Sequence, residues 1–456
     1  MDEAKLLSLK PELDAFLDRY APLFGPSPNA LHARRFVQGL LKGGERRNAE
    51  NIAQAMDGGS VRNLQAFLTT GAWDAADVLS EVRIHLIEHL AEPDAVWNSD
   101  ETGFPKKGMH SVGVARQYSG TMGRTDNCQI GVFANYCSSK GHSFMDRRLY
   151  LPAEWIADMA RREKAGVPDG VVFRTKPELA LEMMTAAVQA SVPFQWAGGD
   201  CVYGDNPTFV RGVRQLGKWY VLDISSDTHV WSEEPRVIAP EDRPKGKGKK
   251  PTKPLVEGKT IPINELVKGL PASAWRRVEV GEGSQGPRMY EYTELWVWFK
   301  EEDGLPGAKE RLLVRRGTGQ EPDLKYHRSN APPEIPLSKL AQVRGTRWSI
   351  EEDIQTGKGE CGLDEYETRG WEGWHHHTAL SILAQAFLVL QKLRLGGKRG
   401  RYDGARSAGI IEPPVGSSRV EHGRIAEMEP LATGTEPPRR RQPLQATARR
   451  NDGKGK

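Results

Sequence analysis

The first ninety or so residues carry apolar side chains at three- and four-residue spacing, which is typical of amphipathic helices. Pro and Gly breaks divide the periodic stretches and indicate where helices begin or end. These stretches read "LLSLKPELDAFLDRYAPLF", "ALHARRFVQGLLKG", "RNAENIAQAM" and "ADVLSEVRIHLIEHL". The pattern predicts an all-helical N-terminal domain at residues 1–94.

From Ala95 the pattern changes to short β-branched or aromatic runs divided by Gly-containing turns, as in consecutive antiparallel hairpins. The runs are "AVWNSD", "HSVGVARQYSG", "NCQIGVFANYC" and "FMDRRLYLP". They are followed by a helix in "ELALEMMTAAVQAS", a strand in "VPFQWAGGD", a helix in "NPTFVRGVRQLG" and a strand in "KWYVLDIS". This order matches a ribonuclease H-like mixed sheet, so we expect an α/β fold whose core begins with residues 95–225.

Residues 226–336 break that rhythm and are predicted to be a strand-rich insertion, with strands in "RRVEVG", "MYEYTELWVWFK" and "ERLLVRR". Between Arg243 and Lys253 the chain has six basic residues and no acid. This run is either a solvated linker or a flexible loop that holds a phosphate backbone, because Lys and Arg neutralise phosphates without reading sequence. In the second case the candidate contacts are Lys247, Lys249 and Lys250.

Helical periodicity returns in "VRGTRWSIEEDIQTGKGE" and "HHTALSILAQAFLVLQKL", so residues 337–397 are predicted to complete the core. Residues 398–456 are rich in Gly, Pro, Arg and Ser, with thirteen Lys plus Arg against seven Asp plus Glu. We expect this basic tail to be disordered, with a weak electrostatic affinity for DNA. Because the formal charge of the whole chain is only +4, the globular remainder is close to neutral.

The four cysteines lack the spacing of metal or redox motifs, which indicates reduced thiols of a cytoplasmic protein. The first residues are acidic and periodic rather than basic and then apolar, so we expect no signal peptide. The longest apolar stretch, Ala379 to Leu393, is too short and too interrupted to cross a bilayer. No membrane contact is expected.

The distribution of acids suggests a metal site for phosphodiester chemistry. Two divalent ions held about 4 Å apart by carboxylates can activate an oxygen nucleophile and stabilise the leaving oxygen. Mg²⁺ prefers a few carboxylates, with water and substrate oxygens completing its shell. Such a site needs three acids that different elements bring to one place.

Asp100 is the first candidate, at the end of the predicted strand "AVWNSD". The following "TGFP" is expected to be a turn that sends the chain back into the next strand. The alternative role for Asp100 is to help close that turn. Glu101 points to the opposite face of the strand and is not expected to share a ligand role.

Asp200 is the second candidate, because it closes "FQWAGGD" at the carboxyl end of a buried strand, where open α/β sheets build their sites. Asp205, in the loop that follows, is a candidate helix cap.

Glu351 is the third candidate. In "RWSIEEDIQTGKGE", Arg347, Glu351 and Lys358 share one face of a helix, while Glu352 and Asp353 rotate away. The alternative is an ion-pair ladder on the helix surface. Two glycines weaken the last turn and leave the position of Lys358 open.

Several long motifs occur in order between about Leu40 and Leu395: "DETGFPKKG", "SVGVARQYSGTMG", "NCQIGVFANY", "DRRLYLPAEW", "GDCVYG" and "RWSIEEDIQTGKGECGLDEYETRGW". In these motifs the chain resembles the DDE-type transposases of bacterial insertion sequences. The resemblance implies a ribonuclease H-like core with an Asp, Asp, Glu triad and a strand-rich insertion before the Glu. Asp100, Asp200 and Glu351 fall on the three catalytic and metal-binding positions.

Related groups carry a Tyr, Arg, Glu, Lys signature with two, three and six residues between successive members. Arg347, Glu351 and Lys358 keep this spacing, whereas Arg344 occupies the Tyr position. The resemblance implies that Arg347 and Lys358 hold phosphates near the scissile bond, Arg in a bidentate manner and Lys as a point charge. Further candidate contacts with the DNA backbone are Lys106 and Lys107.

The function that the resemblance implies is metal-dependent cleavage at transposon ends and strand transfer into target DNA. The implied cofactor is Mg²⁺, as two ions, with Mn²⁺ able to substitute. The implied partners are terminal inverted repeats, target DNA and a second copy of the chain in a homodimer, in the cytoplasm of a bacterium and with the nucleoid when bound to DNA. The helical residues 1–94 would either bind DNA ends or serve as a scaffold.

Two other functions stay open. A retired transposase would only bind DNA or repress its own element. A ribonuclease H-like nuclease would cut without joining, since strand transfer uses the same acids.

Overall fold

The computed structural model describes most of the chain: residues 3–25, 27–42, 44, 46–56, 58–243, 251–283, 286–317 and 323–396. All of them lie in the first of the two units into which the chain divides, Met1–Glu412. The predicted basic-loop contacts and the tail fall outside the described residues: Lys247, Lys249, Lys250 and 398–456. Within the described ranges, no helix has the length and apolar character that a membrane span requires.

The helical pattern of the N-terminal region is confirmed. The elements are α1 (Glu3–Tyr20), η1 (Ala21–Phe24), α2 (Ser27–Lys42), α3 (Ala49–Ala55), α4 (Val61–Thr69) and α5 (Ala75–Leu90). Asn48, Ser60 and Asp74 begin α3, α4 and α5 by accepting hydrogen bonds from backbone N–H groups of the first turns. Helix α4 is not among the predicted helices, although Leu64, Phe67 and Leu68 have helical spacing and are buried.

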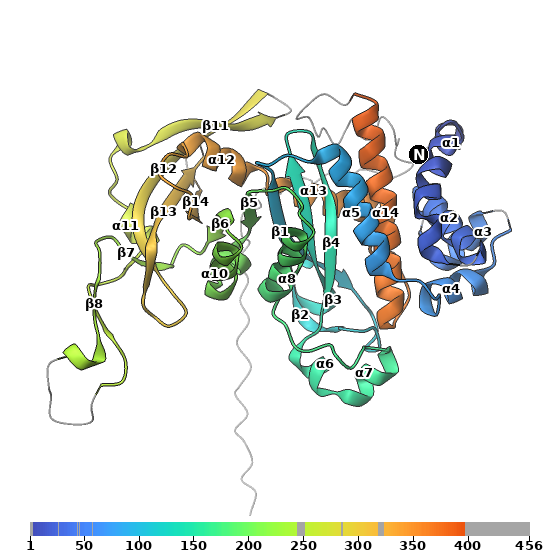
Figure 1. Cartoon of the computed structure of the whole chain (residues 1–456), viewed down its shortest axis with the longest axis horizontal. Coiled ribbons are helices and arrows are strands. Elements are labelled where there is room, and N and C mark those ends of the chain that lie inside the picture. The colour runs from blue at the N-terminus through green and yellow to red at the C-terminus, as the bar shows by residue number, and fades with distance from the viewer. Residues whose placement is uncertain are drawn as a thin grey trace, which may run out of the picture. The chain divides into compact units, whose positions relative to one another are not determined.

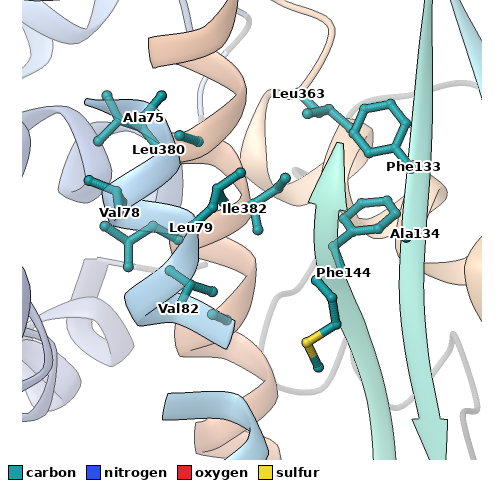
Figure 2. Close-up of a cluster of buried hydrophobic side chains, with 14 of the residues drawn as sticks. Ala75, Val78, Leu79, Val82, Phe133, Ala134, Phe144, Leu363, Leu380 and Ile382 are labelled. Atoms are coloured by element: carbon teal, nitrogen blue, oxygen red, sulfur yellow. The ribbon is translucent and has the colours of Figure 1, made fainter. Parts of the chain in front are cut away.

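The N-terminal helices share one hydrophobic core with the sheet and its helices. Leu79 of α5 lies beside Ile382 of the long helix α14 (Trp371–Arg394), and Phe133 and Phe144 of the sheet belong to the same cluster (Figure 2). Complete burial of such side chains stabilises a fold by about 1.5–3 kcal/mol each. Residues far apart in sequence are therefore tied into one core.

The central strands form the predicted ribonuclease H-like mixed sheet (Figure 1). They are β1 (Val96–Pro105), β2 (Ala115–Ser119), β3 (Arg124–Ser138), β4 (Gly141–Tyr150), β5 (Trp196–Gly199) and β6 (Trp219–Ile224). Their order is β4, β3, β1, β5, β6, in which β3 is antiparallel to β1 and β4, while β5 is parallel to β1 and β6. Between these strands and beside them lie η2 (Gly120–Met122), α6 (Ala153–Ala157), α7 (Met159–Ala165), α8 (Lys176–Gln189), α9 (Cys201–Gly204) and α10 (Pro207–Gln215).

The predicted turn after Asp100 is wrong, because β1 continues through "TGFP" to Pro105. Every residue of β1 pairs with β3, in a register from Val96 opposite Cys137 to Pro105 opposite Cys128. Gly103 marks a close approach instead of a turn, since a Cβ there would collide with the Ser119 side chain. Asp100 is therefore in the middle of a long strand.

The predicted strand-rich insertion extends the core sheet. Strand β14 pairs with β6, and β13, β12 and β7 follow outward. Its elements are β7 (His229–Trp231), β8 (Arg236–Ile238), η3 (Pro240–Asp242), β9 (Leu255–Glu257), β10 (Ile261–Pro262), α11 (Ile263–Val267), η4 (Ala272–Ala274), β11 (Arg276–Gly283), β12 (Gly286–Lys300), β13 (Pro306–Arg316) and β14 (Leu324–Ser329). Strands β8 and β9 form a separate pair.

Two helices return the chain to the centre of the sheet. Helix α12 (Leu337–Gly345) packs against β5, β6 and β11, and α13 (Trp348–Cys361) packs against β1, β3 and β4. Their junction at Thr346 and Arg347 brings the end of the insertion and the start of α13 to the same region as β1 and β6.

Candidate metal site

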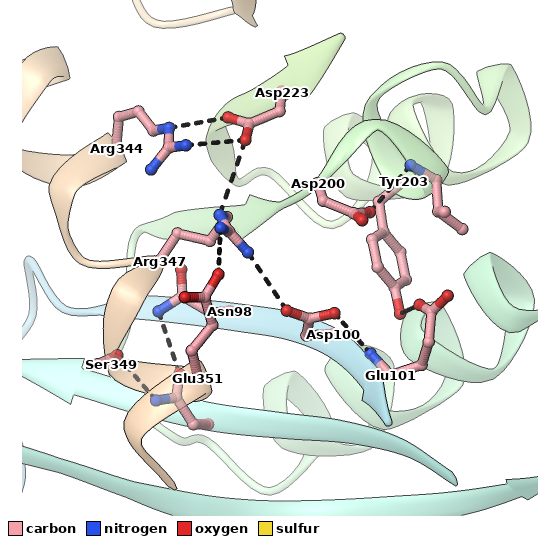
Figure 3. Close-up of polar contacts among 12 residues, drawn as sticks. Asn98, Asp100, Glu101, Asp200, Tyr203, Asp223, Arg344, Arg347, Ser349 and Glu351 are labelled. Carbon is pink, nitrogen blue, oxygen red and sulfur yellow. Dashed lines mark hydrogen bonds and ion pairs between the residues drawn. The ribbon is translucent and has the colours of Figure 1, made fainter. Parts of the chain in front are cut away.

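The three predicted acids come from β1, the end of β5 and the first turn of α13 (Figure 3). The side chain of Asp100 is 15 % exposed, whereas that of Glu351 is 45 % exposed. Asp200 directly follows β5 and caps α9, because its Oδ1 accepts a hydrogen bond from the Val202 N–H at 2.9 Å. The parallel pairing of β1 with β5 places the Asp100 and Asp200 segments on neighbouring strands.

Arg347 connects two of these acids. Its Nη1 donates to Asp100 Oδ2 at 3.3 Å, and its Nη2 donates to Glu351. Its Nε lies 3.7 Å from a further carboxylate, Asp223 Oδ2. The Arg347–Glu351 pair is the i,i+4 ion pair of the ladder alternative, and the further contact of Arg347 with Asp100 links the 45 % exposed Glu351 to β1.

The electrostatics of the site favour binding of a cation. Burial raises the pKa of Asp100 to about 7, and the nearby negative charge of Asp200 adds to this while Arg347 opposes it. Burial also raises the pKa of Asp200 to about 6, with Glu101 adding to the effect. Both carboxyls resist ionisation where they are, and a bound cation would relieve that resistance.

Asp223 on β6 is a polar residue of this centre that the sequence analysis missed. Arg344 Nη2 donates to its Oδ2 at 2.9 Å, and His327 Nδ1 lies 2.8 Å from its Oδ1. Burial alone would raise its pKa, but His327, Arg344 and Arg347 together hold the pKa of Asp223 well below its usual range. Its only signal in the sequence is a single acid inside the apolar run "YVLDI".

Arg344, which departs from the Tyr of the signature, therefore has a defined contact. It joins the end of α12 to the end of β6 through Asp223. A Tyr at this position could not give Asp223 a charged, two-point partner.

Glu101 lies near Asp100 and Asp200, since its negative charge raises the pKa of both, but its side chain has other partners. Its Oε1 pairs with Lys176 Nζ at 2.8 Å, and its Oε2 accepts a hydrogen bond from Tyr203 at 2.9 Å. It contributes negative charge near the site, but its oxygens already have partners.

The predicted basic contacts differ in environment. Lys358 keeps the face of Arg347 and Glu351, and its Nζ donates to the Gly103 carbonyl of β1 at 3.1 Å. Lys106 is turned inward, with Nζ 3.6 Å above the Tyr366 ring. Lys107 is exposed. Burial lowers the pKa of Lys358 and brings that of Lys106 to about 8.

The donor set of Asp100, Asp200 and Glu351 consists of carboxylate oxygens, which fits a hard divalent ion such as Mg²⁺ or Mn²⁺. In the described part of the chain, the group whose ligand atoms all lie within 4.8 Å of one another is His85, Glu88 and His89 of α5, and the oxygens of Asp100, Asp200 and Glu351 are not drawn together to that extent. In the α5 group, however, Arg19 donates two hydrogen bonds to Glu88, at 2.7 and 2.6 Å, and its positive charge opposes a cation. Arg347 likewise pairs with Asp100 and Glu351, so what favours the three acids of β1, β5 and α13 is their all-oxygen donor set and the raised pKa values of Asp100 and Asp200.

The close packing of α9 on β6 gives a testable requirement. A Cβ on Gly204 would collide with the backbone carbonyl of Asp223, which cannot move without shifting β6. Gly204→Ala should therefore lower the free energy of unfolding by about 1–3 kcal/mol in urea titrations. The control is Gly170→Ala, where a Cβ meets nothing within 4 Å. Equal stabilities of the two variants would contradict this packing.

Comparison with known proteins identifies the family. Residues 21–287, more than half of the chain, match the family model described as DDE superfamily endonuclease. The chain belongs to the DDE superfamily of endonucleases. Asp100 and Asp200 lie inside the matched range of this DDE endonuclease, and Glu351 lies beyond it.

This DDE endonuclease is also similar to a probable transposase for insertion sequence element IS701 from Microchaete diplosiphon, with 28 % identity over 223 residues. The match covers 48 % of this chain and 55 % of that relative, so the chain spans about half the length of the relative. Among solved structures, the NurA nuclease from Sulfolobus solfataricus matches 65 % of this chain and 90 % of its own at 8 % identity, with a TM-score of 0.25.

Proposed function

We propose that this DDE endonuclease is the transposase of an insertion sequence, which cleaves DNA at the ends of its element and joins them to target DNA. The observation that carries the proposal is the centre formed by Asp100, Glu351 and Arg347 beside Asp200. The similarity to a probable insertion-sequence transposase supports the same function.

Asp100, Asp200 and Glu351 would hold the divalent ions, which we propose to be two Mg²⁺ with Mn²⁺ as a substitute. When bound, two such ions promote attack by an oxygen nucleophile and stabilise the leaving oxygen. The two carboxyls with raised pKa values must be ionised to bind, so ion binding would release protons at neutral pH.

Two reactions would use this site in succession. Water attacks the phosphodiester at the element end, the bond to the 3′-oxygen breaks, and a 3′-hydroxyl is freed. That hydroxyl then attacks a phosphodiester of the target, loses its proton, and displaces the target's 3′-oxygen. Arg347 would grip a phosphate in a bidentate manner by exchanging its contacts with Asp100 and Glu351, and Lys358 would add a point charge.

Other parts of the chain would support these reactions. We predict that the basic loop, together with Lys106 and Lys107, contacts the DNA backbone. A homodimer on paired ends is a further prediction. So is a location in the cytoplasm, with the nucleoid when the protein is bound to DNA. The helices at residues 1–94 are proposed as a domain that binds DNA ends or supports the core. We also propose that the core has two parts, at 95–225 and 337–397, and that the insertion at 226–336 separates them.

Metal removal tests the function directly. The wild-type chain is incubated with duplex DNA that carries the inverted repeats flanking its coding region, and with a target plasmid. We expect nicks with 3′-hydroxyl ends and joined products in Mg²⁺ or Mn²⁺, and neither product in EDTA, on denaturing gels. A duplex with scrambled ends is the control for recognition.

Two other results of this experiment would indicate a different function. Nicked ends that are never joined would indicate a nuclease without strand transfer. Binding to the repeats without any cleavage in either metal would indicate a retired transposase.

A further inference from the structure

A chain of buried polar side chains lies between β1, β3 and α13. Asn98 Nδ2 donates to Asn135 Oδ1 at 3.1 Å, and Asn135 Nδ2 lies 2.8 Å from Ser349 Oγ and 2.9 Å from Asp353 Oδ2. The four residues are at most 5 % exposed. Figure 3 shows Asn98 and Ser349 close to the candidate metal site.

The same chain continues to β4 and α14. Asp353 Oδ1 accepts a hydrogen bond from Gln385 Nε2 at 3.0 Å and lies 3.0 Å from His142 Nδ1. The other ring nitrogen of His142 is 3.3 Å from Glu352. Although burial opposes its charge, Asp353 and Glu352 raise the pKa of His142 to about 9, so that it is an imidazolium at neutral pH.

This polar chain touches the elements of all three candidate ligands. Asn98 precedes Asp100 by two residues on the same face of β1. It also pairs with Gly198, two residues before Asp200, where a Cβ would collide with the Asn98 side chain. Asp353 is two residues beyond Glu351 on α13.

The geometry of a helix explains why such a connection matters. Residues 351 and 353 are fixed about 200° apart around α13, so the rotation at which Asp353 meets Asn135 also fixes the direction in which Glu351 points. A slip of one residue would turn Glu351 by about 100° and move it about 1.5 Å along the axis. Apolar packing at these positions would bury the helix without specifying its rotation, whereas a satisfied polar network specifies one arrangement.

We propose that Asn98, Asn135, Ser349, Asp353 and His142 form a positioning network that sets the rotation of α13 against β1 and β5, so that Glu351 meets Asp100 and Asp200. These are positioning residues, since they touch the elements that carry the ligands and not the ligands' binding oxygens. The inference rests on the proposed use of the three acids as cation ligands.

Exchanging the amide of Asn135 and the carboxylate of Asp353 tests this network. Asn135→Asp puts a carboxylate opposite Asp353, whereas the double variant Asn135→Asp with Asp353→Asn again pairs one amide with one carboxylate. We expect the single variant to bind Mn²⁺ at least tenfold more weakly in calorimetric titrations, and the double variant to return to within about threefold of wild type. An extra negative charge alone would strengthen cation binding, so a weaker affinity reports geometry.

Two further variants separate positioning from stability. Ser349→Ala removes one hydrogen bond and no charge, and should weaken Mn²⁺ binding less than Asn135→Asp while remaining folded. Val37→Ala, in a fully buried position of α2, should lower the stability in urea and leave the Mn²⁺ affinity unchanged.

The outcomes distinguish this inference from the proposed function. If wild type binds no Mn²⁺, the proposed function fails and this inference fails with it. If wild type binds Mn²⁺ and the folded Asn135→Asp and Ser349→Ala chains bind it equally tightly, the positioning network alone is overturned. An affinity that follows stability across all variants, Val37→Ala included, would also overturn it.

Discussion

Asp200→Asn should reduce metal-dependent DNA cleavage and joining by more than about a thousandfold, because loss of a mere outer-shell partner of a metal site already costs about 10–100-fold. Binding to DNA with the element's ends should persist. An amide oxygen can still accept the Val202 N–H bond that starts α9, and Asn caps helices as well as Asp does. The variant therefore removes the anionic ligand and keeps the local fold.

The measurement compares cleavage rates and gel-shift affinities of wild type, Asp200→Asn and Asp205→Asn. Asp205 is a matched control, because it is an acid five residues along the chain whose carboxylate is occupied by Ser225 and Thr228. Asp205→Asn should cleave at close to the wild-type rate. Cleavage by Asp200→Asn at that same rate would remove Asp200 from the site and contradict the proposed mechanism.

Asp223→Asn should lower the free energy of unfolding at neutral pH by about 3–5 kcal/mol, the usual cost of breaking a buried ion pair from one side. The change would leave Arg344 and Arg347 facing each other without the carboxylate between them. An amide could accept one of their hydrogen bonds, but its N–H₂ group would face a donor. Exposed Asp227→Asn is the control, with an expected change within about 0.5 kcal/mol.

The pH dependence of this effect follows from the lowered pKa of Asp223. A carboxylate with a folded-state pKa below its unfolded value of about 4 stabilises the fold above that pH, and loses this contribution as the pH falls through the folded value. The difference in free energy of unfolding between wild type and Asp223→Asn, measured in urea titrations, should therefore have its full size at pH 7 and decrease below about pH 4. A difference that is constant across this range would mean that the charge of Asp223 is not what stabilises the fold.

Local patterns in the sequence predicted the main strands and helices well. The β-branched and aromatic run "NCQIGVFANYC" and the helical spacing over "RWSIEEDIQTGKGE" depend only on neighbouring residues, and β3 and α13 follow them. The same spacing argument put Arg347, Glu351 and Lys358 on one face, and all three contact β1 or each other.

Where local signals failed, a distant segment decided the structure. Gly103 and Pro105 suggested a turn, but β1 continues through both, because it pairs with β3 along this stretch and Ser119 lies against Gly103. Asp223 gave almost no signal, because its partners are on β14, α12 and the start of α13, more than a hundred residues away.

The sequence by itself determined which residues are candidates for the metal site: acids in a strand, at a strand end and on a helix face. It also placed an Arg and a Lys on that helix face, at the spacing of the family signature. The tertiary structure alone decided which partners they have, with Arg347 linking Glu351 to Asp100 and with Asp200 on the strand beside β1. The side-chain period of each element depends on the backbone of that element, whereas the order of strands and the rotation of α13 depend on contacts among residues such as Asn98, Asn135 and Asp353, which only the folded chain brings together.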